Sequence, residues 1–307
     1  MTAKLNPEIS PLMRAILNTI VYADIFDYPL TIAQIHRYLT GVRAAPESVS
    51  EQLEALDWKA GILNRIGEYY LLTGRENIVN IREQREQTAA RLWPQALRYG
   101  RIIAGLPFVR MVAVTGSLAM NNAGDQGDID FLIVTANDRV WLCRLLVLCV
   151  VRLAAWQKVN LCPNYLVSER ALEIPTRSLY AAHEFTQMVP LAGLDIYQEM
   201  RRLNPWFKNF LPNADSNPTQ TEICDLPLSH PAGLRKLLEM LLSSPIGNWL
   251  ERWEARRKIR KLSRENGGNP EAIFNTDICK GHSNRHGQST EMVLNERLTR
   301  LSLTPKG

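Results

Sequence analysis

The spacing of apolar and polar positions in the first part of the chain predicts three short helices and a hairpin. The helices are expected over residues 12–23, 32–39 and 48–59, and a strand, a turn and a strand over residues 62–72. Thr31 and Ser48 each precede an apolar-periodic run, so they are the expected N-caps of the second and third helices.

The middle of the chain alternates strand-like and helix-like runs, which is typical of an α/β core. A long amphipathic helix, which Pro94 is expected to kink, is predicted over residues 75–105. The elements expected after it are strands over residues 109–114, 129–135 and about 165–168, and helices over residues 139–157 and about 178–203. A boundary loop is expected at residues 204–219, followed by a basic helical region and a final helix around residues 292–301.

Three parts are therefore expected along the chain: residues 1–75, 76–215 and 216–307. In the first part, three helices followed by a small hairpin resemble a winged helix. The expected third helix is acidic, with Glu51, Glu54 and Asp57 in it and Glu47 just before it. A helix that reads DNA needs positive charge, because phosphate neutralisation supplies most of the affinity. Packing or partner binding is therefore favoured over DNA recognition.

The net charge of +5 on the 307 residues is concentrated in one segment. Residues 235–265 hold nine Lys and Arg against four Asp and Glu, an excess of five, so the rest of the chain is balanced. Such a segment can border a phosphate site or meet an anionic surface. An ordinary solvated helix face remains the alternative.

Composition and termini favour a cytoplasmic protein without a membrane span. The most apolar run, residues 140–156, contains Arg144 and Arg152, so it is expected to be a buried helix. Residues 1–11 lack the pattern of a signal peptide. The five cysteines have no CxxC spacing, which favours reduced thiols over disulfides or zinc.

The most informative motif is a Gly-Ser turn followed by a pair of aspartates. Gly116 and Ser117 come directly after an expected strand, and Asp128 and Asp130 open the next one. Alternation along a strand places both carboxylates on one face, with Cα atoms about 6.5 Å apart, from two rises of ~3.3 Å. Paired carboxylates suit Mg²⁺ or Mn²⁺, and glycine lets the backbone approach a phosphate. A solvated turn at a strand edge is the simpler alternative.

This motif resembles the active-site signature of the nucleotidyltransferase superfamily, which includes DNA polymerase β and small bacterial nucleotidyltransferases. The resemblance covers about residues 90–170 and implies an α/β (α+β) nucleotidyltransferase-like core. It implies that Gly116 and Ser117 bind the triphosphate of a nucleoside triphosphate, while Asp128 and Asp130 hold the metal and are catalytic. The implied reaction moves a nucleoside monophosphate to a hydroxyl acceptor. The sequence does not identify that acceptor, and a nucleic acid is not favoured.

One departure from the family pattern leaves a second function open. The family usually has a third carboxylate on a later strand, but residues 158–165 offer only Asn160 and Asn164. Glu169 is a substitute if the strand register differs. Because asparagine is a far poorer base than a carboxylate, the alternative is a non-catalytic nucleotide-binding or regulatory module.

The tail holds Lys280, His282 and His286, whose role the sequence leaves open. Gly281 and Gly287 argue against a regular helix that would bring the two imidazoles onto one zinc ion. A surface loop is expected there, with a phosphate contact as the alternative.

Overall fold

The computed structural model describes residues 9–55, 61–125, 127–215, 232–281 and 286–301. Its α-helices are α1 (Pro11–Asp24), α2 (Ile32–Arg37), α3 (Pro46–Glu54), α4 (Asn77–Ala104), α5 (Gly116–Ala119), α6 (Val140–Trp156), α7 (Leu179–Gln187), α8 (Leu194–Leu203), α9 (Ala232–Leu242), α10 (Pro245–Glu265) and α11 (His286–Arg300). Its strands are β1 (Leu63–Ile66), β2 (Tyr69–Leu72), β3 (Val109–Thr115), β4 (Ile129–Thr135), β5 (Leu161–Ser168), β6 (Val189–Ala192), β7 (Ile273–Phe274) and β8 (Ile278–Lys280). Short 3₁₀ helices are η1 (Glu169–Ala171) and η2 (Pro205–Asn209).

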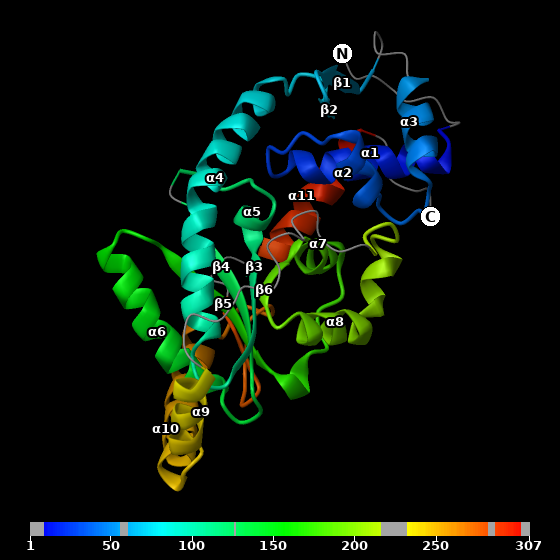
Figure 1. Cartoon of the computed structure of the whole chain (residues 1–307). Helices are drawn as coiled ribbons and strands as arrows, with labels where there is room; N and C mark the ends of the chain where they lie inside the picture. The colour runs from blue at the N-terminus through cyan, green and yellow to red at the C-terminus, as the bar shows by residue number, and fades with distance from the viewer. Residues whose placement is uncertain (1–8, 56–60, 126, 216–231, 282–285, 302–307) are drawn as a thin grey trace.

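A mixed six-stranded sheet of order β6-β3-β4-β5-β8-β7 forms the centre of the molecule. The neighbours β4 and β5 run parallel, and every other neighbouring pair is antiparallel. Because alternate strand residues point to opposite faces, Val112, Val114 and Phe131 pack with α4 and α6, while Ala113, Leu132 and Val134 pack with α7 and α8. The sheet therefore lies between two helical layers (Figure 1). The predicted α/β class is confirmed at this level.

The N-terminal helices and the β1-β2 hairpin form a third apolar core. The prediction for α2 is confirmed, since Thr31 and Gln34 form a reciprocal capping box. The prediction that Ser48 caps the third helix is wrong. That helix starts at Pro46, whose fixed φ and missing N–H suit a first turn, and Ser48 lies inside it. Residues 56–60 of the expected helix lie outside the described residues, and the likeness to a winged helix stays a prediction.

The single helix predicted over residues 178–203 is wrong. The structure has α7, the strand β6 and α8 in its place. Pro190 cannot donate a backbone hydrogen bond, so it is tolerated in β6, which lies at the edge of the sheet. Gly193, with φ of 75°, then turns the chain into α8.

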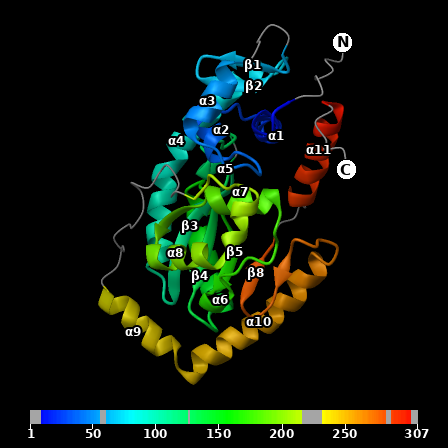
Figure 2. The same cartoon turned by 90° about the vertical axis from the view of Figure 1, so that its right-hand side faces the viewer.

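The C-terminal part contributes strands that the sequence pattern did not predict. The expected surface loop at Lys280 is wrong, because Lys280 ends β8 and pairs with Tyr165 of β5. The final helix, α11, begins at His286 and lies beside α1 (Figure 2), where Leu294 joins the N-terminal core. The boundary loop expected at residues 204–219 is only partly a loop, because residues 205–209 form η2 and Trp206 is buried there. Residues 216–219 lie outside the described part.

None of the helices that the structure describes has both the length and the apolar character of a membrane span. The boundaries expected at residues 75 and 215 stay predictions. In the structure the first and last parts of the chain contact each other, because Arg297 pairs with the buried Asp24, which also pairs with Arg75. The N-terminal helices lie over one end of the sheet (Figure 1).

Candidate functional site

A cleft of about 480 Å³ lies between the N-terminal helices and the sheet. All four predicted site residues line it: Gly116, Ser117, Asp128 and Asp130. The opposite wall comes from the N-terminal part, with Tyr22, Phe26 and Tyr28 among its residues. The remaining walls come from β5, α7 and the start of α11. The cleft therefore depends on parts of the chain that are far apart in the sequence.

The two aspartates converge as the strand alternation predicts. One ligand atom from each of Asp128, Asp130 and Cys162 lies within 4.8 Å of the other two. Cys162 is brought there by β5, where it pairs with Asp130 in parallel register. Burial, followed by the charges of the two aspartates, raises the pKa of the Cys162 thiol to about 12. The thiol therefore stays protonated, and the carboxylates are the better ligands for a cation.

The electrostatics of Asp130 favour a bound cation. Burial, then the charge of Asp128 and that of Glu184, raise the pKa of the Asp130 carboxyl to about 8, partly offset by the Asn164 amide. A divalent cation between the carboxylates would counter the repulsion and stabilise both ionised forms. Two oxygen donors on neighbouring positions suit a hard cation, so the donor set fits Mg²⁺ or Mn²⁺.

The Gly-Ser turn packs closely against Asp130 of the carboxylate pair. Gly116 has φ of 65°, and a Cβ at this position would overlap the Oδ2 atom of Asp130. Only glycine satisfies both conditions, so the close approach of the turn depends on it. Ser117 also lines the cleft and brings a hydroxyl group to it. The predicted helix after the turn, α5, has four residues, so its dipole contributes little to anion binding.

Of the three candidates for the missing carboxylate position, the structure brings Asn164 into the site. The Asn164 Nδ2 atom donates to Asp130 Oδ1, and its Oδ1 accepts from the Cys162 thiol at 2.7 Å. The Asn160 carbonyl only accepts a strand bond from Ile129. The Glu169 hypothesis is wrong, because this residue follows the opposite end of β5, about 20 Å along the strand at ~3.3 Å per residue.

Glu184 of α7 also lines the cleft, although the sequence did not predict it as a site residue. Burial raises the pKa of the Glu184 carboxyl to about 7, partly offset by the nearby Lys280 ammonium. Lys280 lines a neighbouring cavity of about 260 Å³ together with Glu184 and Glu271. No motif marks Glu184, because its place in the cleft depends on how α7 crosses the sheet.

The other residues singled out in the sequence have different outcomes. His286 lines the cleft from the start of α11, while His282 lies outside the described residues. The prediction that the basic residues 235–265 border the site is wrong, since none of the described residues that line the cleft belongs to α9 or α10. Their alternative role at an anionic surface stays open.

His183, which lines the cleft, makes the unfolding free energy of the protein dependent on pH. Its ring stacks on Tyr22, with centroids 4.0 Å apart and planes 9° apart, and its Nδ1 atom lies 3.2 Å from the Gln187 amide. Burial lowers the pKa of His183 to about 3. The unfolded chain, with an ordinary pKa of about 6.5, therefore binds more protons, and stability is lost as the pH falls below that value.

We expect His183→Phe to remove this dependence. Relative to the variant, the wild type should lose about 1.4 kcal/mol of unfolding free energy per pH unit below about 6.5, or about 2 kcal/mol by about pH 5. Urea unfolding of both proteins between about pH 7 and about pH 5 measures the difference. Parallel stability curves over that range would contradict it.

The fold and the site define an α/β protein with an aspartate pair, a thiol and a glycine turn in one cleft. Comparisons with protein-family models, with curated proteins and with solved structures found no match. The function is therefore inferred from the residues of the cleft and their arrangement.

Proposed function

We propose that the protein is a metal-dependent nucleotidyltransferase that moves a nucleoside monophosphate from a nucleoside triphosphate to a hydroxyl acceptor. The observation that supports this most is the turn at Gly116, which lies directly against Asp130 in the cleft. A phosphate cradle and a pair of cation ligands are thus next to each other. The proposal includes a nucleotidyltransferase-like core and a winged-helix-like N-terminal unit.

Each site residue has a role in this proposal. Asp128 and Asp130 hold Mg²⁺ or Mn²⁺, and the bound ion supplies charge neutralisation for the reacting phosphate oxygens. Gly116 leaves room for the triphosphate, and the Ser117 hydroxyl donates to a phosphate oxygen. The cleft volume falls within the range of about 300–1,000 Å³ that is usual for small-molecule sites. The aromatic wall of Tyr22, Phe26 and Tyr28 offers surfaces for a base or an acceptor.

Proton acceptance is where the catalytic and non-catalytic alternatives separate. Asn164 occupies the place beside Asp130 but cannot act as a base, and this observation favours a nucleotide-binding or regulatory module. Glu184 favours catalysis, because a carboxyl in the cleft with a pKa of about 7 can accept a proton near neutral pH. We assign the role of proton acceptor to Glu184.

The proposal is tested by thermal unfolding with each of the four common nucleoside triphosphates, with and without Mg²⁺, and by pyrophosphate release. Nucleotide at ~100-fold above its Kd should stabilise the protein by about 2.7 kcal/mol, and only when the metal is present. Stabilisation without pyrophosphate release from any hydroxyl acceptor tried would support the binding module. No metal-dependent stabilisation with any nucleotide would contradict both.

A further inference from the structure

The helices α9 and α10 carry a large apolar surface that the cleft does not use. Among the described residues, eight of the thirteen exposed large apolar side chains lie on these two helices or their junction. They are Leu234, Leu237, Leu238, Met240, Leu241, Ile246, Trp249 and Trp253. Such a concentration marks an interaction surface, because single exposed apolar residues are normal but a contiguous group is not.

The exposed side chains follow helical spacing on both helices. Leu234, Leu237, Leu238 and Leu241 repeat at intervals of three and four residues, so they share one face of α9. Ile246, Trp249 and Trp253 continue the same kind of spacing on α10. We call these seven residues the apolar stripe. In a helix that packs on its own domain, a stripe of this kind faces the core, whereas here it faces outward.

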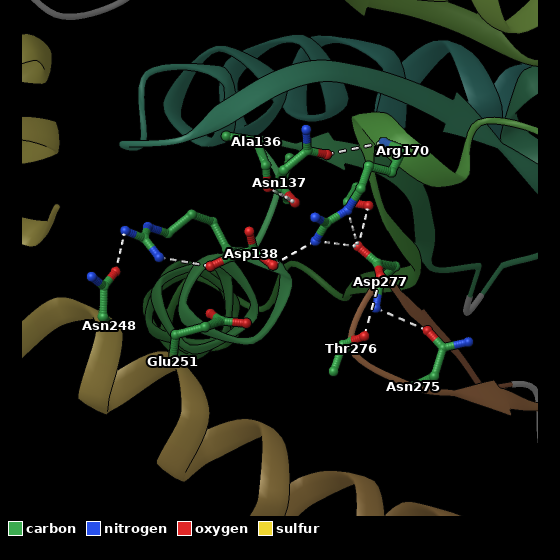
Figure 3. Close-up of polar contacts among 12 residues, drawn as sticks. Ala136, Asn137, Asp138, Arg170, Asn248, Glu251, Asn275, Thr276 and Asp277 are labelled. Carbon is green, nitrogen blue, oxygen red and sulfur yellow. Dashed lines mark hydrogen bonds and ion pairs between the residues drawn. The ribbon is translucent and has the colours of Figure 1, made fainter.

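The opposite sides of the two helices hold them to the molecule and fix this orientation, through apolar packing and through polar contacts. The residues that pack against the core are Leu242, Leu250 and Ile259. On α9, Glu239 accepts from the Phe108 backbone at 2.7 Å and pairs with Arg110 at 3.0 Å. On α10, Asn248 and Glu251 extend toward the start of α6 (Figure 3), where Glu251 accepts from two backbone N–H groups at 3.1 and 2.6 Å. Both helices lie across the end of the molecule opposite the N-terminal part (Figures 1 and 2).

Positive charge borders the apolar stripe. The rings of Trp249 and Trp253 stack at 6.1 Å, in a groove of about 470 Å³ that is otherwise lined by Arg252, Arg256, Arg257 and Arg260. The Arg257 guanidinium lies 5.0 Å from the centre of the Trp253 ring. This end of the molecule therefore combines exposed leucines, tryptophans and arginines, and the arginines belong to the segment that holds the whole net charge.

We propose that α9 and α10 dock the protein onto an anionic lipid surface. The apolar stripe enters the boundary between headgroups and acyl chains, the tryptophans lie at that boundary, and the arginines meet the lipid phosphates. The helices lie in the plane of the surface and do not cross it. Docking leaves the cleft at the other end of the molecule open to its substrates.

Other occupants explain less of the surface. A second copy on a two-fold axis would bring the arginines of both chains together, which opposes association. A single-stranded nucleic acid would use the tryptophans and arginines but would leave the α9 leucines in water. Only a lipid surface accounts for the leucines and the positive charge together.

The test is flotation of the full chain with vesicles of phosphatidylcholine alone and with about 30% phosphatidylglycerol. We expect binding to the anionic vesicles only, with a blue shift of tryptophan emission. The triple variant Leu234→Gln, Leu237→Gln, Leu241→Gln and the triple variant Arg252→Gln, Arg256→Gln, Arg260→Gln should each weaken binding at least about tenfold. Trp249→Phe with Trp253→Phe should remove the blue shift.

Matched controls are Leu153→Gln on α6 and Arg101→Gln on α4, exposed residues away from the stripe, which should bind like the wild type. All variants should keep the unfolding temperature of the wild type, because the changed side chains are exposed. Absence of anionic vesicle binding, or binding as strong as that of the wild type by both triple variants, would overturn the proposal. So would self-association through the stripe, or tight binding to an oligonucleotide with none to vesicles.

Discussion

Replacing either Asp128 or Asp130 with Asn is expected to abolish the metal-dependent stabilisation by nucleoside triphosphates and to lower turnover by at least about a thousandfold. The loss is large because the bound ion carries several kcal/mol of transition-state stabilisation, and ~1.4 kcal/mol corresponds to a factor of ten. The apo proteins should stay folded, with unfolding temperatures equal to or above that of the wild type. The reason is that each change removes repulsion between neighbouring carboxylates, the second cause of the raised pKa of Asp130.

The matched control is Asp125→Asn, which changes an exposed acid in the loop before the pair but outside the ligand cluster. It should keep both the metal-dependent shift and the turnover. If Asp128→Asn and Asp130→Asn keep the full shift, the pair is not the metal site. If the wild type shows the shift without turnover, Asn164→Asp tests whether a carboxylate beside Asp130 introduces turnover.

Asn204→Leu is expected to destabilise the folded protein by about 4 kcal/mol, although Asn204 is not among the residues that line the cleft. The Asn204 side chain is completely buried and makes four hydrogen bonds. Its Oδ1 accepts from the Ile174 backbone at 2.7 Å and the Trp206 indole at 3.0 Å, and its Nδ2 donates to the carbonyls of Leu172 and Met200. Leucine has a similar volume but leaves these buried partners unpaired, at about 1–3 kcal/mol each and not fully additive.

Urea unfolding at neutral pH measures this loss, with Asn209→Leu in the exposed last position of η2 as the control. The control should change stability by less than about 0.5 kcal/mol. A loss below about 1 kcal/mol for Asn204→Leu would mean that the four partners find water or new donors in the variant.

The sequence predicted those elements whose apolar run or periodicity is long enough to be recognised. The strand β4 was predicted at its observed bounds, because a continuous apolar run follows Asp130 and a polar loop precedes it. In contrast, β6 and β8 have four and three residues, which is too short for a recognisable alternation of apolar and polar positions. The proline in β6 even argues against a strand, until the sheet order shows that β6 is an edge.

The site was predictable only where its residues are close in the sequence. Asp128 and Asp130 share one strand, so their common face follows from alternation. Cys162 and Asn164 reach the site through the register of β5 on β4, and Glu184 through the crossing of α7 over the sheet. Register and crossing are set by packing between distant segments, which one sequence does not display.

The pairing of β5 with β8 also has a consequence for biosynthesis. The edge of β5 is covered by Lys280, Cys279 and Ile278, which the ribosome makes more than a hundred residues later. Until then a nascent chain holds both aspartates but lacks Gly281 and His286, which complete the cleft. An exposed strand edge invites pairing with other chains, so the edge of β5 is open to such pairing until β8 has been made. The complete cleft, and with it the proposed nucleotide binding, is therefore expected only after translation has passed the start of α11.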